Sequence, residues 1–82
     1  MNKLLVEIHL PAIAHTYDVF IPYGAKIYEL TPLIAGAAEK LSDGLFIAAD
    51  AVLCDGESGA ILNVNLTVED IKLQNGSKLM LV

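Results

Sequence analysis

The sequence has no arginine, no tryptophan and a single cysteine. These shortages exclude several classes of binding partner and binding site. All five basic residues are lysines and stand against ten acids, so the net charge is −5. Nucleic acid binding needs clustered lysine and arginine, so the balance argues against nucleic acid and an anionic membrane surface as partners. Cys54 alone can form neither an internal disulfide nor a cysteine-rich zinc site. One cysteine fits a reducing, cytoplasmic location.

A long apolar run is also missing, although 55% of the residues are hydrophobic. A membrane-spanning helix needs about 18 apolar residues, whereas Leu30 to Ala38 is about half that length and contains Pro32. Glu7 and His9 interrupt the apolar N-terminus, so we expect neither a targeting segment nor direct membrane insertion. The length predicts a single domain over residues 1–82. So small a domain leaves apolar side chains at its surface, and a protein-binding surface is their expected use.

Two alternating segments at the start of the chain predict a pair of strands. Apolar residues recur at every second position from Lys3 to Leu10 and again from Thr16 to Ile21. This period of two is the pattern of strands with two different faces. The intervening segment, Pro11 to His15, is short enough for a hairpin connection. Pro22 and Gly24 then end the second strand.

An amphipathic pattern from about Lys26 to Leu41 predicts one helix of about four turns. Pro32 removes an internal hydrogen bond, but it points outward, where water can satisfy the freed carbonyl. An alternative begins the helix at Thr31 as the N-cap, with Pro32 in the first turn. We favour the longer helix because it aligns more of the apolar side chains. The expected apolar face consists of Ile27, Leu30, Ile34, Ala37, Ala38 and Leu41.

The last third of the chain is predicted to be largely extended. Strands are expected at Phe46 to Cys54 and at Ala60 to Val64, with a turn at Asp55 to Gly59 between them. Leu66 to Ile71 has the pattern of a short helical turn capped by a threonine. Lys78 to Val82 predicts the final strand. A mixed sheet of four or five strands with one helix packed on one face, an α+β fold, buries these apolar faces economically.

This order of elements resembles the β-grasp fold of ubiquitin. The segment Leu66 to Val82 is similar to the final third of ubiquitin-like domains, and Tyr17 to Pro22 resembles their second strand. The spacing of Ile27, Leu30 and Ile34 resembles the buried face of their helix. The resemblance covers nearly the whole chain, except that Leu45 to Asn65 is several residues longer than in ubiquitin.

Within that superfamily the chain resembles the YukD/EsaB group, small ubiquitin-like proteins associated with bacterial type VII (WXG-type) secretion. Asp70, Gly76, Leu79 and Leu81 take the places of the residues that characterise the end of these proteins. The resemblance implies a bacterial, cytoplasmic, non-enzymatic adaptor that acts by protein–protein binding. A component of the secretion system is then the expected partner.

The absence of a Gly-Gly tail bears on conjugation. Ubiquitin and the sulfur carriers react through such a tail, whereas this chain stops at Val82 within the last predicted strand. We therefore expect a protein that is not conjugated. One alternative is a small accessory or carrier subunit of an enzyme complex, with a sulfur-carrier-like fold but no reactive tail, since fold does not fix function. Another is a homodimer with an unrelated role.

No group of residues has a convincing catalytic or metal-binding pattern. His9 and His15 could meet across the first hairpin, but two ligands without a neighbouring acid or cysteine make a weak site. Asp55 beside Cys54 disfavours the reactive thiolate. The turn from Asp55 to Gly59 lacks the full ligand spacing of a calcium loop. We expect no catalytic residue, no metal and no cofactor.

Four apolar residues are the candidates for a partner-binding face. If the strands alternate as predicted, Leu5, Phe20, Met80 and Val82 project from the sheet face opposite the helix. That face commonly receives partners in ubiquitin-like domains, and Met80 and Val82 resemble the last-strand part of ubiquitin's apolar patch. The face could bind a partner, close a homodimer, or be an ordinary scatter of exposed apolar side chains. A partner could instead add a strand at a sheet edge.

Overall fold

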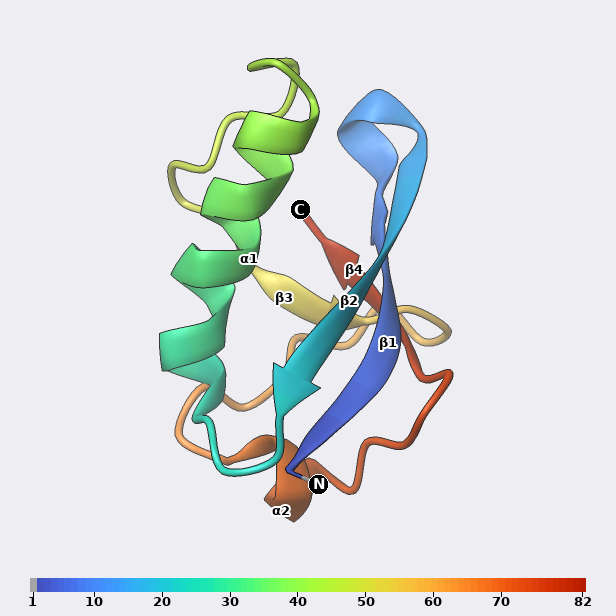
Figure 1. Cartoon of the computed structure of the whole chain (residues 1–82), viewed down its shortest axis with the longest axis vertical. Coiled ribbons are helices and arrows are strands. Elements are labelled where there is room, and N and C mark those ends of the chain that lie inside the picture. The colour runs from blue at the N-terminus through green and yellow to red at the C-terminus, as the bar shows by residue number, and fades with distance from the viewer. Residues whose placement is uncertain (1) are drawn as a thin grey trace.

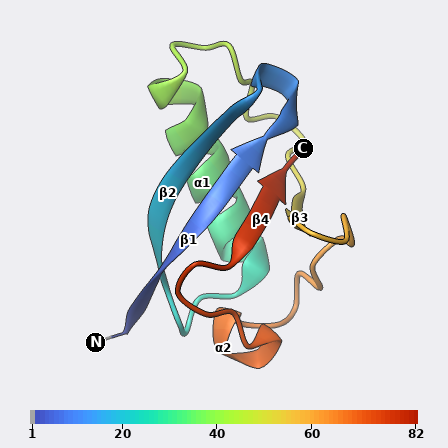
Figure 2. The ribbon, with the colours of Figure 1, turned by 90° about the vertical axis from the view of Figure 1, so that its right-hand side faces the viewer.

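A mixed sheet with one long helix across one face forms the body of the computed structural model, which describes residues 2–82 (Figure 1). The strands are β1 (Lys3–Leu10), β2 (His15–Pro22), β3 (Leu53–Asp55) and β4 (Lys78–Leu81). They lie in the order β2-β1-β4-β3, with β1 and β4 parallel and the other two pairs antiparallel. Figure 2 shows the long helix α1 (Ile27–Leu41) behind the sheet. The predicted α+β architecture is confirmed with four strands.

The β1–β2 hairpin follows directly from the alternation in the sequence. Leu4, Val6, Ile8 and Leu10 are buried, as a strand with one face on the core requires. A short 3-10 turn at Pro11–Ile13 connects the strands. The second strand is one residue longer at each end than predicted.

Helix α1 begins where the longer of the two interpretations placed it, so the alternative start at Thr31 is wrong. The backbone N–H of Lys26, the N-cap, donates to the Glu29 carboxylate at 2.9 Å. This bond satisfies a donor that the first turn would leave unpaired. Pro32 lies inside the helix with its ring exposed. The carbonyl four residues before Pro32, that of Tyr28, therefore lacks a helical partner on the exposed side of α1, where water can hydrogen-bond to it.

The buried face of α1 differs from the predicted face near its C-terminal end. Ala35 is buried in addition to the expected residues, whereas Ala37 and Leu41 are exposed. Both exposed residues lie on the side of α1 towards β2, the last strand of the sheet in that direction. A helical wheel predicts which residues share a side but not how far the sheet beneath them extends. The residues buried are Ile27, Leu30, Ile34, Ala35 and Ala38.

The segment after α1 is less regular than predicted. The expected strand from Phe46 to Cys54 is wrong for most of its length, because β3 covers only Leu53–Asp55. The expected return strand at Ala60 to Val64 is also wrong, since it makes a single bridge, Cys54 with Ile61. Apolar content alone does not distinguish a buried strand from a buried loop.

Side chains at the end of α1 explain this irregular path. The Ser42 hydroxyl accepts a hydrogen bond from the Phe46 N–H at 3.0 Å, and the Glu39 carboxylate accepts one from the Ala48 N–H at 2.8 Å. Phe46 is buried in the core. These side chains take backbone donors that a strand would offer to a neighbouring strand.

The short helix α2 (Val68–Ile71) is the predicted threonine-capped turn. The Thr67 hydroxyl accepts from the Asp70 N–H, and the Asp70 carboxylate accepts from the Thr67 N–H, both at 3.0 Å. This reciprocal pair satisfies two donors at the start of the turn. The hydrogen bonds from Thr67 to the Asp70 carboxylate lower the pKa of Asp70 below 3.8, and the nearby Lys26 contributes in the same direction.

We expect part of the stability of the protein to disappear in acid. A carboxyl group whose pKa is lower in the folded state stabilises the fold above its unfolded pKa and ceases to do so as pH falls through the folded pKa. For Asp70 the loss begins near pH 3.8 and continues below it. Urea unfolding between pH 7 and pH 2 should show a shallower acid loss for Asp70→Asn than for the unsubstituted protein. Identical pH profiles would contradict this role of Asp70.

Candidate partner-binding face

The four candidate residues lie on the predicted sheet face, but in two separate pairs. Leu5 on β1 is directly opposite Phe20 on β2. Met80 on β4 lies beside His9 of β1, and Val82 follows two positions later. Phe20 is 66% exposed and Val82 51% exposed, while Met80 is only half-buried. The structure therefore brings Leu5 to Phe20 and Met80 to Val82, at opposite ends of β1.

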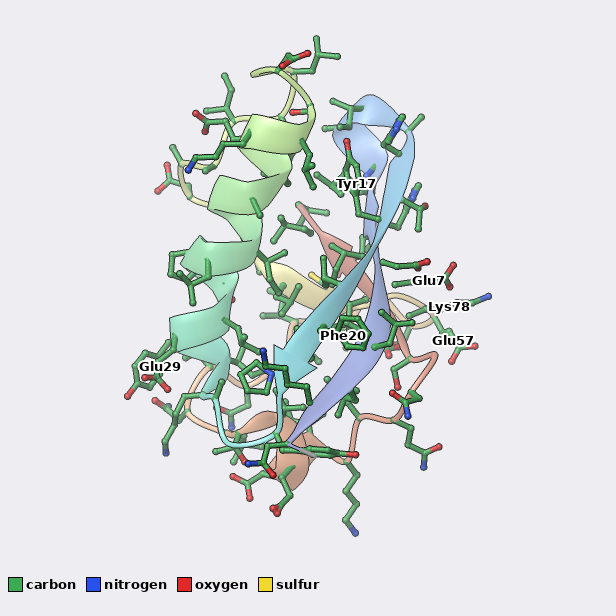
Figure 3. All side chains as sticks on the ribbon, in the orientation of Figure 1. Glu7, Tyr17, Phe20, Glu29, Glu57 and Lys78 are labelled. Atoms are coloured by element: carbon green, nitrogen blue, oxygen red, sulfur yellow. The ribbon has the colours of Figure 1, made fainter. Side chains whose placement is uncertain are left out.

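A polar band separates these two pairs. Glu7 is opposite Asp18 on β2 and beside Lys78 on β4. The next outward position of β1, His9, is paired with Thr16, and the His9 Nδ1 and Thr16 Oγ1 atoms lie 3.0 Å apart. Figure 3 shows Glu7 and Lys78 projecting to the same side of the sheet. The face is therefore apolar at its two ends and charged in the middle.

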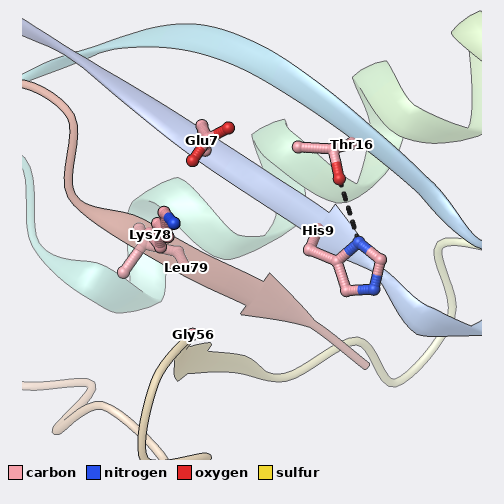
Figure 4. A pocket seen from close by; sticks show the side chains of 6 residues that line it. All are labelled: Glu7, His9, Thr16, Gly56, Lys78 and Leu79. Carbon is pink, nitrogen blue, oxygen red and sulfur yellow. Dashed lines mark hydrogen bonds between the residues drawn. The ribbon is translucent and has the colours of Figure 1, made fainter.

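The polar band contains a shallow depression of about 270 Å³. Figure 4 shows Glu7, His9 and Lys78 around it, with the bond between His9 and Thr16. It is lined by Glu7, His9, Thr16, Gly56, Lys78 and Leu79. The geometry offers one acid, one imidazole and one ammonium group at an open surface. Within residues 2–82 no three histidine, cysteine, aspartate or glutamate side chains lie close enough to hold a metal ion.

The other candidates for chemistry are not brought together. His9 pairs with Thr16 and His15 with Leu10, so the two histidines occupy adjacent registers and project to opposite faces of the hairpin. Cys54 is buried. The Asp55 carboxylate accepts hydrogen bonds from the N–H groups of Ser58 at 2.7 Å and Glu57 at 3.2 Å. These bonds, chiefly those from Ser58, lower the pKa of Asp55 and make this segment a tight turn.

A second surface was not anticipated from the sequence. A groove of about 220 Å³ runs between β2 and α1, and every residue that lines it is apolar. Leu33 forms its outer wall and is 71% exposed. The signal available in the sequence was Leu33 itself, an apolar residue on the side of the helix that faces water. The groove is lined by Val19, Phe20, Ile21, Pro22, Leu30, Leu33, Ile34 and Ala37.

The fold matches known structures over its full length. The ubiquitin-like domain of EccD5 from Mycobacterium xenopi superposes with a TM-score of 0.83 at 18% identity, covering 100% of this chain and 94% of that one. The ubiquitin-like domain of the Mycobacterium tuberculosis type VII secretion system protein EccD1 gives 0.79 at 13%, covering 100% and 99%. Ubiquitin from Caldiarchaeum subterraneum gives 0.73 at 12%, covering 96% and 90%. No family model and no curated protein matches the chain.

The fold is the ubiquitin-like β-grasp. The predicted fold class is thereby confirmed, while membership of the YukD/EsaB group stays a prediction. In this fold the sheet has one face on α1 and one towards solvent, so the two apolar pairs and the β2–α1 groove are open to contact by another molecule. Among residues 2–82 no helix has the length and apolar character needed to cross a membrane.

Proposed function

We propose that this protein is a non-enzymatic adaptor of a bacterial type VII-like secretion system that acts by binding another protein of that system. The observation that carries the proposal is the full-length similarity to the ubiquitin-like domain of EccD1, a type VII secretion system protein. The similarity extends from end to end of both chains, so the same set of elements is available for contact. Fold similarity alone does not specify a partner. The kind of partner therefore has to be inferred from the residues exposed at the surface.

The surface supports a binding role. Phe20 and Leu5 form an exposed apolar pair on adjacent strands, and Val82 lies beside Met80 at the other end of the face. A few well-buried side chains contribute most of the binding free energy of an interface, and an exposed aromatic residue such as Phe20 is a candidate for one of them. Charged residues between the pairs, including Glu7, give a partner polar contacts that orient it. The sheet face is complementary to a protein surface that offers apolar contacts at two ends and polar contacts between them.

Substitution of the apolar pairs tests the proposal. Phe20→Glu and Met80→Glu place a charge where we expect a dry contact, so each should reduce partner recovery by at least about fivefold, equivalent to about 1 kcal/mol. The measurement is affinity purification of the tagged chain from its own bacterium after crosslinking, with the bound proteins quantified by mass spectrometry. Secretion-system components should be enriched with the unsubstituted chain.

Leu45→Glu is the matched control, because Leu45 is 76% exposed and lies in the segment after α1. It should recover the same proteins as the unsubstituted chain, and circular dichroism should show all variants folded. The proposal is wrong if secretion-system components are not enriched, or if the face variants and Leu45→Glu recover them equally. Enrichment of an adenylating enzyme in their place would support the carrier alternative.

A further inference from the structure

Strand β2 has an open edge. The sheet order places β2 at one end and β3 at the other. The β3 edge is covered by its own returning segment, since the Asp55 N–H donates to the Ala60 carbonyl at 2.8 Å and the Leu62 N–H to the Leu53 carbonyl at 3.1 Å. No strand of residues 2–82 covers β2 in this way. An uncovered edge offers unpaired backbone groups to an added strand.

The hydrogen bonds of β1 reveal which groups of β2 are free. The Glu7 N–H donates to the Ser77 carbonyl at 3.0 Å, and the Leu5 carbonyl accepts from the Gly76 N–H at 2.8 Å. The odd-numbered residues of β1 therefore direct their backbone groups towards the β4 side. In a strand the backbone groups of successive residues point to alternate sides, so the even-numbered residues of β1 bond to β2.

The free backbone groups of β2 belong to its own even-numbered residues. Val6 is paired with Val19, and both direct their backbone groups at each other. Thr16, Asp18 and Phe20 consequently direct their N–H and C=O groups away from β1, towards solvent. These three residues form a row that an extended segment could bond to.

The apolar groove adjoins this row. A strand added to β2 would alternate its side chains between the outer sheet face and the side of α1. Side chains on the α1 side would enter the groove, where Leu33 and Ala37 form one wall and Val19 the other. That wall accepts aliphatic side chains at every second position of the added strand.

The charge on the outer sheet face determines which side chains suit the outward-facing positions of the added strand. Asp18 lies at the centre of the free row, directly opposite Glu7, so two carboxylates stand side by side on one face. Like charges directly opposite each other destabilise a strand pair, and an opposite charge stabilises it. A second copy of the chain, paired about the centre of its free row, would place Asp18 against Asp18. Lys78 lies beside Glu7 on the other side, so a lysine or arginine in the added strand would place the matching positive charge beside Asp18.

We propose that the β2 edge and the β2–α1 groove bind an extended segment of another protein in which aliphatic residues alternate with lysine or arginine. The segment adds as a fifth strand, with its aliphatic side chains against Leu33 and Ala37 and a basic side chain beside Asp18. Main-chain hydrogen bonds supply affinity and the two side-chain rows supply specificity. This inference rests on the proposed adaptor function and states the chemistry of the partner.

A synthetic seven-residue peptide of alternating valine and lysine is the probe, and the same peptide with glutamate in place of lysine is its control. Addition to the whole, isotope-labelled chain should give saturable NMR shifts along β2 and α1. Amide exchange of Asp18 and Phe20 should slow at least about tenfold at saturation, since their N–H groups become bonded. The glutamate peptide should bind at least about tenfold more weakly.

Two variants locate the site. Asp18→Lys should reverse the preference, so that the glutamate peptide binds more tightly than the lysine peptide. Leu33→Glu should weaken the lysine peptide at least about tenfold through loss of the apolar wall, whereas Leu45→Glu should leave its affinity unchanged. The replaced side chains are exposed, and circular dichroism verifies folding.

Equal binding of the two peptides, unchanged exchange of the Asp18 and Phe20 amides, or shifts confined to the surface around Met80 would overturn the inference. Any of these results would leave the adaptor proposal standing, with docking through the sheet face. Conversely, peptide binding at β2 without enrichment of secretion-system components would remove the adaptor proposal and retain the strand-binding edge.

Discussion

Leu79→Ala should lower the free energy of unfolding by about 2–5 kcal/mol, the usual effect of removing a large side chain from a packed core. Leu79 is 1% exposed and lies on β4, between β1 and β3. Its side chain belongs to the cluster of apolar residues between the sheet and α1. Small domains are stable by about 5–15 kcal/mol, so this one truncation removes a large share of the total. Urea denaturation followed by circular dichroism measures it.

Met80→Ala is the matched control for Leu79→Ala. Met80 is the next residue of the same strand but projects from the opposite face and is only half-buried. Its truncation should cost clearly less, because part of the side chain stays in water in the folded protein. Equal losses for the two variants would mean that the core does not lie on the α1 side of β4.

Gly56→Ala should destabilise the protein by about 1–3 kcal/mol, because the added methyl group overpacks a rigid part of the sheet. A Cβ atom at Gly56 would lie 2.7 Å from the Lys78 carbonyl oxygen and 2.8 Å from its carbonyl carbon. The Gly56 N–H donates to that same oxygen at 2.8 Å. The contact is with backbone, so it can be relieved only by moving the end of β3 away from β4. Urea denaturation at neutral pH measures the loss.

Gly36→Ala is the same substitution in a setting where we expect the opposite sign. Gly36 lies within α1, and a Cβ atom there would meet nothing within 4 Å. Alanine in a helix interior is more favourable than glycine by about 0.5–1 kcal/mol, so this variant should be more stable than the unsubstituted protein. A neutral or stabilising Gly56→Ala would show that β3 and β4 can separate without loss.

The two proposed binding modes share one residue and differ in the others. Phe20 belongs both to the apolar pair on the sheet face and to the lining of the β2–α1 groove. Met80 belongs only to the sheet face, and Leu33 only to the groove. If a natural partner loses affinity with Phe20→Glu and Leu33→Glu but not with Met80→Glu, it binds as an added strand. The reverse pattern for Leu33 and Met80 indicates docking on the sheet face.

The local elements of this protein follow from its sequence. The period-two alternation of β1 depends on neighbours within a few residues. The same holds for the apolar face of α1, which continues on both sides of Pro32. The cap of α2 is local too, since Thr67 and Asp70 satisfy each other's backbone donors. Their order along the chain was enough to predict the ubiquitin-like sheet and helix, because few arrangements bury these faces together.

Only the tertiary structure decided the path after α1 and the shape of the surface. At the start of the segment from 46 to 52, Ser42 and Glu39 at the end of the helix take the backbone donors of Phe46 and Ala48, whereas Val52 bonds to Val82. The four candidate residues form two pairs because the β1–β4 register sets Met80 beside His9, away from Leu5. The groove exists because the sheet ends at β2 and no further strand covers the side of α1 next to it. Strand register and edge position depend on contacts between segments that are distant in the sequence, so local periodicity does not predict them.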